Sequence, residues 1–187
     1  MNFLKPKFWD KKQISIFSIL LAPIAFFVKL LFFLKRFGTK SHKCSIPVIC
    51  IGNIYLGGTG KTPLSIETFL ILKDLKMNPA FIRKEYDDFI DETNLQKKIG
   101  SVYMDKKRLN AIKSAIKNKK NVAILDDGFQ DFSIKKDLSI ICFNEKQWIG
   151  NGFTIPSGPL REKLSALKRA EIVVITGHKN FSIEKNI

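Results

Sequence analysis

The stretch "GNIYLGGTGKTP", residues 52–63, contains the residue types that hold the phosphates of a nucleotide. Glycines allow backbone N–H groups to approach phosphate oxygens, and a helix that starts after them presents its positive end to the same anion. The lysine of this stretch would neutralise the β- and γ-phosphates, and the threonine hydroxyl that follows it would bind Mg²⁺. These features predict an ATP site formed by Gly57, Gly58, Thr59, Gly60, Lys61 and Thr62.

The loop departs from the usual phosphate-binding pattern at one position. The pattern has a glycine five residues before Gly60, where this sequence has Tyr55. The glycine pair at 57–58 supplies the backbone freedom instead. Partition-type ATPases use a similar loop with a signature lysine just before the two glycines. The residue at that position here is Leu56, which argues against that class.

A pair of acids, Asp126-Asp127, directly follows an apolar run at residues 122–125. In P-loop folds, an acid at the end of a neighbouring strand holds the magnesium ion, often through water. Adjacent carboxylates point to opposite sides if the strand continues, so one of them would face the metal and the other could orient a loop or act as a base. An ordinary turn after a strand is the alternative explanation of "DDG".

The elements that would position these residues alternate between strands and helices. Short apolar runs predict buried strands at 46–53, 79–83, 121–130, 137–144 and 171–177. Helical patterns cover 61–76, 105–120 and 158–170, whereas the polar stretch that ends at about Ile99 shows no regular pattern. The alternation predicts an α/β fold, a P-loop NTPase-like parallel sheet flanked by helices.

A long apolar segment, Ile14–Leu34, precedes this fold. It contains one charge, Lys29, and one proline, Pro23, which should kink a helix. Residues 1–45 hold nine basic residues and one acidic residue, and such flanks favour an anionic membrane surface. We predict a membrane-associated helical anchor at 1–40 and a P-loop lobe at 41–187. Spanning and interfacial placement both fit the anchor, and an ordinary core helix is the alternative.

Composition and spacing argue against several other classes of protein. The net charge of +15 would suit a nucleic-acid-binding protein, but the basic residues at the N-terminus bracket apolar sequence instead of alternating with aromatic residues. The three cysteines, Cys44, Cys50 and Cys142, show neither paired spacing nor a metal-site pattern, which favours a reducing compartment. No small-residue cleavage site follows the apolar segment, so a signal peptide is disfavoured.

Four stretches together resemble the tetraacyldisaccharide 4′-kinase family of lipid A biosynthesis: "GNIYLGGTGKTP", "ILDDGFQ", "DLSIICFN" and "GNGFTIPSGPLREKLSALKRAEIVVITG". The resemblance extends from about residue 3 to residue 177 and includes the N-terminal apolar segment. It implies that ATP phosphorylates the 4′-hydroxyl of an acylated glucosamine disaccharide 1-phosphate at the cytoplasmic face of the inner membrane. By this likeness, Asp126 and Asp127 belong to the Mg²⁺ and catalytic cluster, with Thr62 and Asp127 as metal ligands. Gln130 and Arg161 match motif positions and receive no role.

Other positions depart from the pattern of that family. The family motif Arg-Gly-Tyr-Gly-Gly is represented by Arg83 followed by "KEYDD", and Asp131 stands where the family has a histidine. The family's Gly-Asp-Glu motif supplies an aspartate near the attacking hydroxyl, for which "IDET" offers Asp91. The family also has a second lobe with a catalytic histidine, which we expect to be missing from this chain and which a separate chain could supply. Two functions therefore follow: the 4′-kinase itself, or a non-catalytic membrane-bound nucleotide-binding remnant or regulator.

Overall fold

The computed structural model describes residues 5–10, 14–85 and 90–178. Its strands are β1 (Val48–Gly52), β2 (Pro79–Lys84), β3 (Val102–Asp105), β4 (Val122–Asp126), β5 (Leu138–Asn144) and β6 (Ile172–Thr176). They form a six-stranded sheet in the order β3-β2-β4-β1-β5-β6. The pairings of β1 with β4, β2 with β4 and β2 with β3 are parallel, so the predicted parallel α/β sheet is confirmed.

The chain divides into two compact units, which we describe separately. One unit consists of residues 40–52 and 60–140, and the other of residues 1–39, 53–59 and 141–187. The first unit contains β1 to β4 together with the helices α3 (Lys61–Asp74), α4 (Ile90–Ile99) and α5 (Arg108–Lys117). We call it the sheet unit. The second contains the N-terminal helices, most of β5, and β6, and we call it the N-terminal unit.

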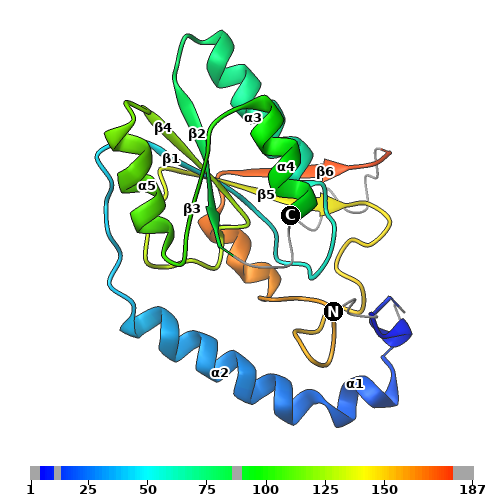
Figure 1. Ribbon diagram of the computed structural model, residues 1–187. Helices are drawn as coiled ribbons and strands as arrows, with labels where there is room; N and C mark the ends of the chain where they lie inside the picture. Colours follow the sequence, from blue (N-terminus) through cyan, green and yellow to red (C-terminus); the bar gives the residue numbers. More distant parts are fainter. Residues whose placement is uncertain (1–4, 11–13, 86–89, 179–187) are drawn as a thin grey trace. The chain divides into compact units, whose positions relative to one another are not determined.

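Helices cover both faces of the sheet unit. The connection through α3 runs from β1 to β2, and the connection through α4 continues in the same direction to β3, whereas α5 leads back to β4. Because crossovers between parallel strands are right-handed, α3 and α4 lie on one face and α5 on the other (Figure 1). The carboxyl ends of β1, β2 and β4 therefore meet at one edge, beside the start of α3.

The core of the sheet unit explains why these segments form strands. Residues 122–125 of β4 and the apolar side chains of β1 and β2, except Ile49, are almost completely buried. The Phe69 ring of α3 stacks on Phe81 of β2, with ring centroids 4.6 Å apart. A β-carbon at Gly100 would lie 2.1 Å from Cζ of Phe69, so this position requires glycine to let the ring in. Cys50 packs here as a small hydrophobe, and burial raises its pKa to about 12.

The N-terminal unit begins with η1 (Lys7–Trp9), followed by α1 (Ile16–Leu20) and α2 (Ala22–Gly38). Trp9 is buried, and its indole Nε1 donates to the carbonyl oxygen of Pro156 at 3.1 Å. Ser18 of α1 is also buried and accepts a hydrogen bond from Asn151 Nδ2 at 3.1 Å. These contacts fix the start of the chain against the loop at 147–160 within this unit.

The interruption predicted at Pro23 is confirmed, and it is a break instead of a kink. The segment forms two helices that part at Leu21, just before Pro23, because proline clashes with the preceding turn. Within the part of the chain that the structure describes, no helix combines the length and apolar character needed to cross a bilayer.

Two further predictions on secondary structure are corrected. The polar stretch before Ile99 is not irregular, because α4 covers its second half and β3 follows it. The helix predicted at 158–170 is only a 3-10 helix, η2 (Leu164–Arg169). Leu160 instead forms bridges with Tyr55 and Thr154, which holds the backbone before η2 extended. The "KEYDD" departure spans residues 84–88, and its last three residues lie outside the described part of the chain.

Candidate active site

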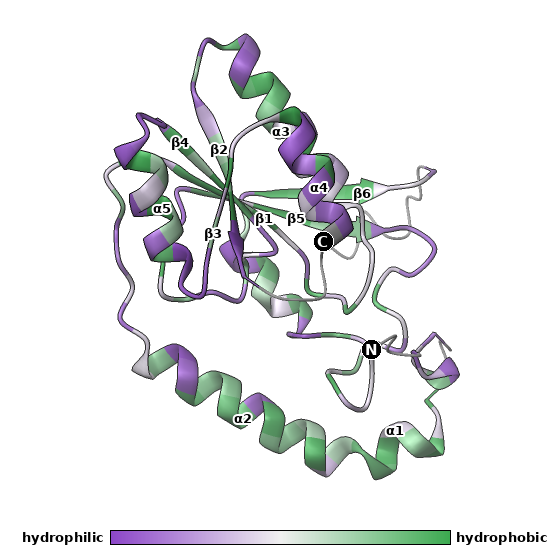
Figure 2. Ribbon diagram, in the orientation of Figure 1, coloured by the Kyte–Doolittle hydropathy of each residue, from purple (hydrophilic) through white to green (hydrophobic). Residues whose placement is uncertain are grey.

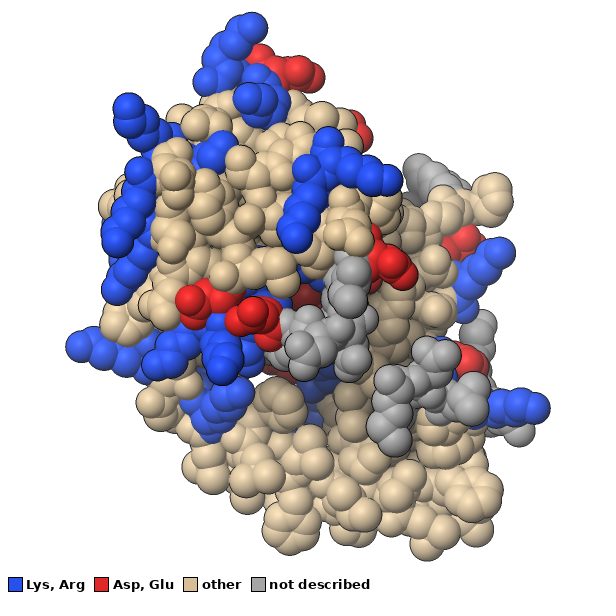
Figure 3. Space-filling model, in the orientation of Figure 1, with Lys and Arg blue, Asp and Glu red and all other residues tan. Residues whose placement is uncertain are grey.

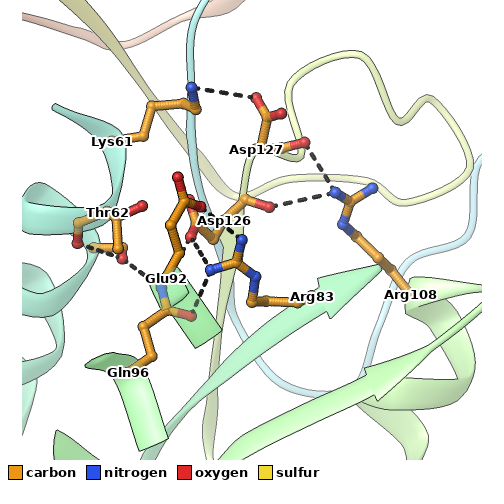
Figure 4. Close-up of polar contacts among 9 residues, drawn as sticks. Lys61, Thr62, Arg83, Glu92, Gln96, Arg108, Asp126 and Asp127 are labelled. Carbon is orange, nitrogen blue, oxygen red and sulfur yellow. Dashed lines mark hydrogen bonds and ion pairs between the residues drawn. The ribbon is translucent and has the colours of Figure 1, made fainter. Parts of the chain in front are cut away.

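The start of α3 has the geometry of an anion site. Gly60 precedes the helix with φ +84°, a left-handed conformation that favours glycine, and its carbonyl oxygen accepts from the N–H of Leu64 at 3.2 Å. Lys61 and Thr62 therefore occupy the first turn, where backbone N–H groups have no partner within the helix. Lys61 Nζ lies 3.9 Å from Oδ1 of Asp127, so the predicted lysine and one predicted carboxylate are neighbours (Figure 4).

The preceding loop, residues 53–59, belongs to the N-terminal unit. Asn53 is buried, and its Nδ2 donates to the carbonyl oxygen of Gly57 at 3.2 Å and to Oγ1 of Thr59 at 2.9 Å. Gly57 has φ +137°, and both it and Gly58 are exposed. Asn53 thus closes the glycine-rich turn on itself. The sequence predicted that this motif binds phosphate, but it did not predict that Asn53 holds the turn in place through these hydrogen bonds.

Tyr55, which replaces the usual glycine of the pattern, is completely buried. Its hydroxyl accepts a short hydrogen bond from Lys5 and lies 3.2 Å from Oδ1 of Asp10. The backbone on both sides of Tyr55 pairs with the "GPLRE" motif, through Leu56 N to Pro159 O at 2.8 Å and Arg161 N to Ile54 O at 2.7 Å. The motif position of Arg161 is therefore explained in part by its backbone, which supports the start of the loop.

Asp126, the last residue of β4, has a buried carboxylate whose two oxygens differ in their hydrogen-bond partners. Oδ2 accepts from Arg83 Nη1 at 3.1 Å and from Gln96 Nε2 at 2.9 Å. Oδ1 is buried and has no hydrogen-bond partner among the described residues. Burial raises the pKa of Asp126, and the charge of Arg83 opposes that shift. A carboxylate oxygen left in this state is suited to a ligand that supplies positive charge.

The contacts of Asp126 continue to α4 and α3 (Figure 4). Gln96 Nε2 also donates to Ser65 Oγ at 2.8 Å, and Ser65 Oγ donates to the carbonyl oxygen of Thr62 at 2.8 Å. Arg83 reaches Oε2 of Glu92 on α4 at 2.8 Å, with its other terminal nitrogen. The network ties the first turn of α3 to the end of β4. We call the buried residues Arg83, Gln96, Asp126 and Ser65 the buried network, and Glu92 lies at its exposed edge.

Asp127 adopts φ +54° immediately after β4 ends, so the predicted alternation of neighbouring carboxylates along a continuing strand does not apply. Nη2 of Arg108 donates to the carbonyl oxygens of Asp126 and Asp127 at 3.3 and 2.9 Å. Nη1 of Arg108 pairs with Asp131 Oδ2 at 3.2 Å. Burial alone would raise the pKa of Asp131, but the Ser133 hydroxyl and Arg108 lower it.

The remaining predicted catalytic residue, Asp91, lies apart from these contacts. It is exposed in the first turn of α4, and no hydrogen bond or ion pair joins it to the described part of the chain. Its neighbour Glu92 reaches Arg83 instead. Sequence reasoning missed the roles of Arg83, Gln96 and Arg108, because each reaches partners far along the chain and no local motif connects them.

The oxygens present fit Mg²⁺. Magnesium prefers hard oxygen ligands and is bound through one or two carboxylates together with phosphate oxygens. The unpartnered Oδ1 of Asp126 and the hydroxyl of Thr62 are such oxygens, and Asp127 lies beside Lys61. No group of three His, Cys, Asp or Glu side chains that could hold a metal occurs among the described residues.

Comparison with known proteins gives consistent matches along the chain. The profile of the family described as tetraacyldisaccharide-1-P 4′-kinase matches residues 17–98 and 87–186. A tetraacyldisaccharide 4′-kinase of Pelagibacter ubique is 46% identical over 179 residues, which cover 96% of this chain and 57% of that protein. One from Rhodopseudomonas palustris strain BisA53 is 30% identical over 191 residues, with 92% of this chain and 55% of that protein covered.

A solved structure has the same arrangement of elements. The "apo" form of LpxK from Aquifex aeolicus in complex with ATP superposes with a TM-score of 0.74 at 25% sequence identity. The match covers 86% of this chain and 59% of that chain. This chain thus spans a little over half the length of the relatives that it matches.

Proposed function

Because this chain belongs to the tetraacyldisaccharide-1-P 4′-kinase family, we propose that it phosphorylates the 4′-hydroxyl of a tetraacyldisaccharide 1-phosphate in lipid A biosynthesis, with ATP as the donor. The observation that carries the proposal is the first turn of α3, where Lys61 faces Asp127 and Thr62 is tied to the buried network. The ATP complex of the Aquifex aeolicus relative supports the choice of nucleotide.

The residues of the site suit phosphoryl transfer, which depends on positioning and on stabilisation of charge. Lys61 would neutralise negative charge on the β- and γ-phosphates, and the N–H groups of the first turn of α3 would hold their oxygens. Asp126 and Thr62 would hold Mg²⁺ together with Asp127, and the ion would draw charge from the transferred phosphoryl group. Arg83 and Gln96 fix Oδ2 of Asp126, which leaves Oδ1 for the metal.

We also propose that α1 and α2 bind the membrane that contains the glycolipid, at the cytoplasmic face of the inner membrane. These helices are apolar along most of their length (Figure 2), and their visible face in Figure 3 is almost free of charged side chains. Large apolar side chains are more than half exposed at Ile16, Phe17, Ile19, Leu20, Ile24, Phe26, Phe27, Leu31, Phe33, Leu34 and Phe37. Exposed apolar residues in this number mark an interaction surface.

Charge and exposed apolar side chains favour an interfacial position on an anionic membrane. Lys35 and Arg36 lie in the last turn of α2, where they can meet anionic headgroups. The helices would lie along the surface with their exposed apolar side chains among the upper acyl chains. A kinase held in this way would meet its glycolipid acceptor without extracting it from the membrane.

Non-catalytic nucleotide binding is the second candidate function. It is favoured by the position of Asp91, whose exposed carboxylate contacts none of the described site residues. On this alternative, Lys61 and the buried network would hold Mg-ATP, and no acceptor would be phosphorylated. The two candidates therefore share nucleotide binding and differ in phosphoryl transfer.

Transfer of labelled γ-phosphate to tetraacyldisaccharide 1-phosphate in detergent tests the proposal. We expect transfer by the parent chain, a strong loss in Lys61→Ala, and little change in Lys73→Ala, which removes an exposed lysine from the last turn of the same helix. ATP binding without transfer would establish the second candidate. Absence of ATP binding would refute both.

Binding to vesicles tests the membrane proposal separately. Phe27→Asp on α2 should reduce sedimentation with vesicles of anionic phospholipid, because it places a charge on an apolar surface. Ile71→Asp on α3 is the matched control, since its side chain is also apolar and about half exposed but lies in the sheet unit. Equal effects of the two substitutions would contradict a membrane role for α2.

A further inference from the structure

Arg108 is the first residue of α5, and only 7% of it is exposed. A buried guanidinium needs acceptors, because its charge and its five N–H donors lose water on folding. Two of its acceptors are backbone carbonyl oxygens of the acidic pair at the end of β4, at 3.3 Å for Asp126 and 2.9 Å for Asp127. One nitrogen therefore holds two successive peptide groups (Figure 4).

These two peptide groups flank an unusual backbone conformation. Asp127 has φ +54°, which few residues other than glycine adopt, although aspartate and asparagine tolerate it better than most. Its N–H donates to the carbonyl oxygen of Ile51 on β1 at 2.9 Å. The peptide groups on both sides of its Cα are thus fixed, one by β1 and one by Arg108. This conformation directs the carboxylate toward Lys61.

Arg108 is itself held by Asp131. Oδ2 of Asp131 lies 3.2 Å from Nη1 of Arg108, while Oδ1 accepts from the backbone N–H of Ser133 at 3.1 Å and from its hydroxyl at 2.5 Å. Because Ser133 occupies one carboxylate oxygen, the other is oriented toward the guanidinium. The planar fork of arginine can serve the carboxylate and the two carbonyls at once, which a lysine cannot.

We propose that Arg108 is a positioning residue that holds the carboxylate of Asp127 where it meets Mg-ATP, and that Asp131 anchors Arg108 in this task. The inference rests on the proposed function, because it assigns to Asp127 a role toward the metal-bound nucleotide. Arg108 acts through the backbone of Asp127, and we assign it no contact with the substrate.

Nucleotide titrations of the 187-residue chain test this role. We expect Arg108→Lys to weaken binding of Mg-ATP roughly 10-fold, as is usual for residues that orient a metal ligand, and to weaken Mg-free ATP much less. Asp127→Asn should show the same difference. The double variant should bind Mg-ATP no worse than Asp127→Asn alone, because two residues that act through one group are not additive. Lys113→Ala, an exposed charge on the same helix, is the matched control.

Two results would overturn the inference: an equal loss for Mg-ATP and Mg-free ATP in Arg108→Lys, or a double variant whose loss is the sum of the single losses. Either would make Arg108 a purely structural residue. If Arg108→Lys fails to fold, Asp131→Asn replaces it. That variant retains an acceptor for Ser133 and turns an amide toward Arg108. We therefore expect it, too, to weaken binding of Mg-ATP more than binding of Mg-free ATP, and equal losses would overturn the inference.

A readout without nucleotide separates this inference from the proposed function. If the parent chain does not bind ATP, the proposed function fails, whereas hydrogen exchange still reports the conformation of Asp127. Its amide should exchange faster in Arg108→Lys than in Lys113→Ala, because the hydrogen bond to Ile51 loses its support. Exchange at the parent rate would overturn the positioning role.

Discussion

The two neighbouring carboxylates at the end of β4, Asp126 and Asp127, form ion pairs that differ in burial and geometry. Arg83 and Asp126 approach to 3.1 Å, with 9% and 1% of their side chains exposed. Lys61 and Asp127 are 3.9 Å apart, with 14% and 35% exposed. The second pair is open to a ligand, whereas in the first only Oδ1 of Asp126 lacks a partner among the described residues. We infer that the other contacts of the buried network maintain the site, and that Lys61, Asp127 and Oδ1 of Asp126 serve Mg-ATP.

The strongest test of this contrast removes the cation of the buried pair. Arg83→Met should lower the free energy of unfolding by about 3–5 kcal/mol, because it leaves the Asp126 carboxylate buried without its counter-charge. Denaturant unfolding measures the loss, and Lys98→Met on the exposed side of α4 is the control. Exposed ion pairs contribute at most about 1 kcal/mol to stability. A loss below that value would show that the pair of Arg83 and Asp126 stabilises the fold no more than an exposed pair does. Adding Asp126→Leu to Arg83→Met should restore part of the stability.

The accessible pair should give the opposite result. Lys61→Ala should weaken ATP binding by about 10- to 100-fold, since hydrogen bonds to charged groups contribute roughly 1.5–3 kcal/mol. The free energy of unfolding should stay within about 0.5 kcal/mol of the parent. Calorimetric titration and thermal unfolding measure the two quantities. Unchanged ATP affinity would refute the assignment of the loop.

The helix that contributes Gln96 can be tested through its packing. Gly100→Ala should lower the free energy of unfolding by about 1–3 kcal/mol, because its β-carbon would overlap the Phe69 ring. Gly38→Ala, at the end of α2, is a matched control, since nothing lies within 4 Å of its added carbon. It should be neutral or slightly stabilising. Equal effects would show that α4 is not packed as described.

The smallest effect that we expect concerns pH. The folded-state pKa of Asp131 lies below its ordinary value, so its ionised form stabilises the fold above about pH 4. That contribution, on the order of 1 kcal/mol, is lost as the pH falls through the lowered pKa. The stability difference between the parent and Asp131→Asn should therefore shrink on acidification below about pH 4. The raised pKa of Asp126 gives stability the opposite pH dependence. Because both proteins contain Asp126, its contribution cancels in the difference between them. A difference that is constant with pH would contradict the ion pair.

The sequence predicted the elements that apolar runs or a local motif mark. The buried side chains of β1 and β4 are mostly apolar, and the glycine loop marks the start of α3. The helix α4 was missed because its buried residues, Thr93 and Gln96, are polar. Hydrophobic periodicity cannot reveal a helix whose inner face makes hydrogen bonds. The helix expected at 158–170 failed for a related reason, since Leu160 uses its backbone to form bridges.

The same limit applied to the site. Lys61, Thr62, Asp126 and Asp127 belong to local motifs, and their chemistry follows from their neighbours in the chain. Arg83, Gln96 and Arg108 acquire their roles only when the sheet brings distant segments together. Arg108 reaches Asp127 from 19 residues away, and Gln96 reaches Asp126 from 30 residues away. Such residues can be found from a sequence only with knowledge of which strands are adjacent.

The ion pair of Arg83 and Asp126 also constrains how the sequence can evolve. A single substitution in this pair leaves the other charge buried without its counter-charge, and selection would remove it before a second change could compensate. Replacement of both together by packed apolar residues avoids that penalty but removes Oδ1 of Asp126, which we propose as a metal ligand. The two positions should therefore stay charged together among descendants of this chain. Glu92, with 45% of its side chain exposed, should drift more freely than either.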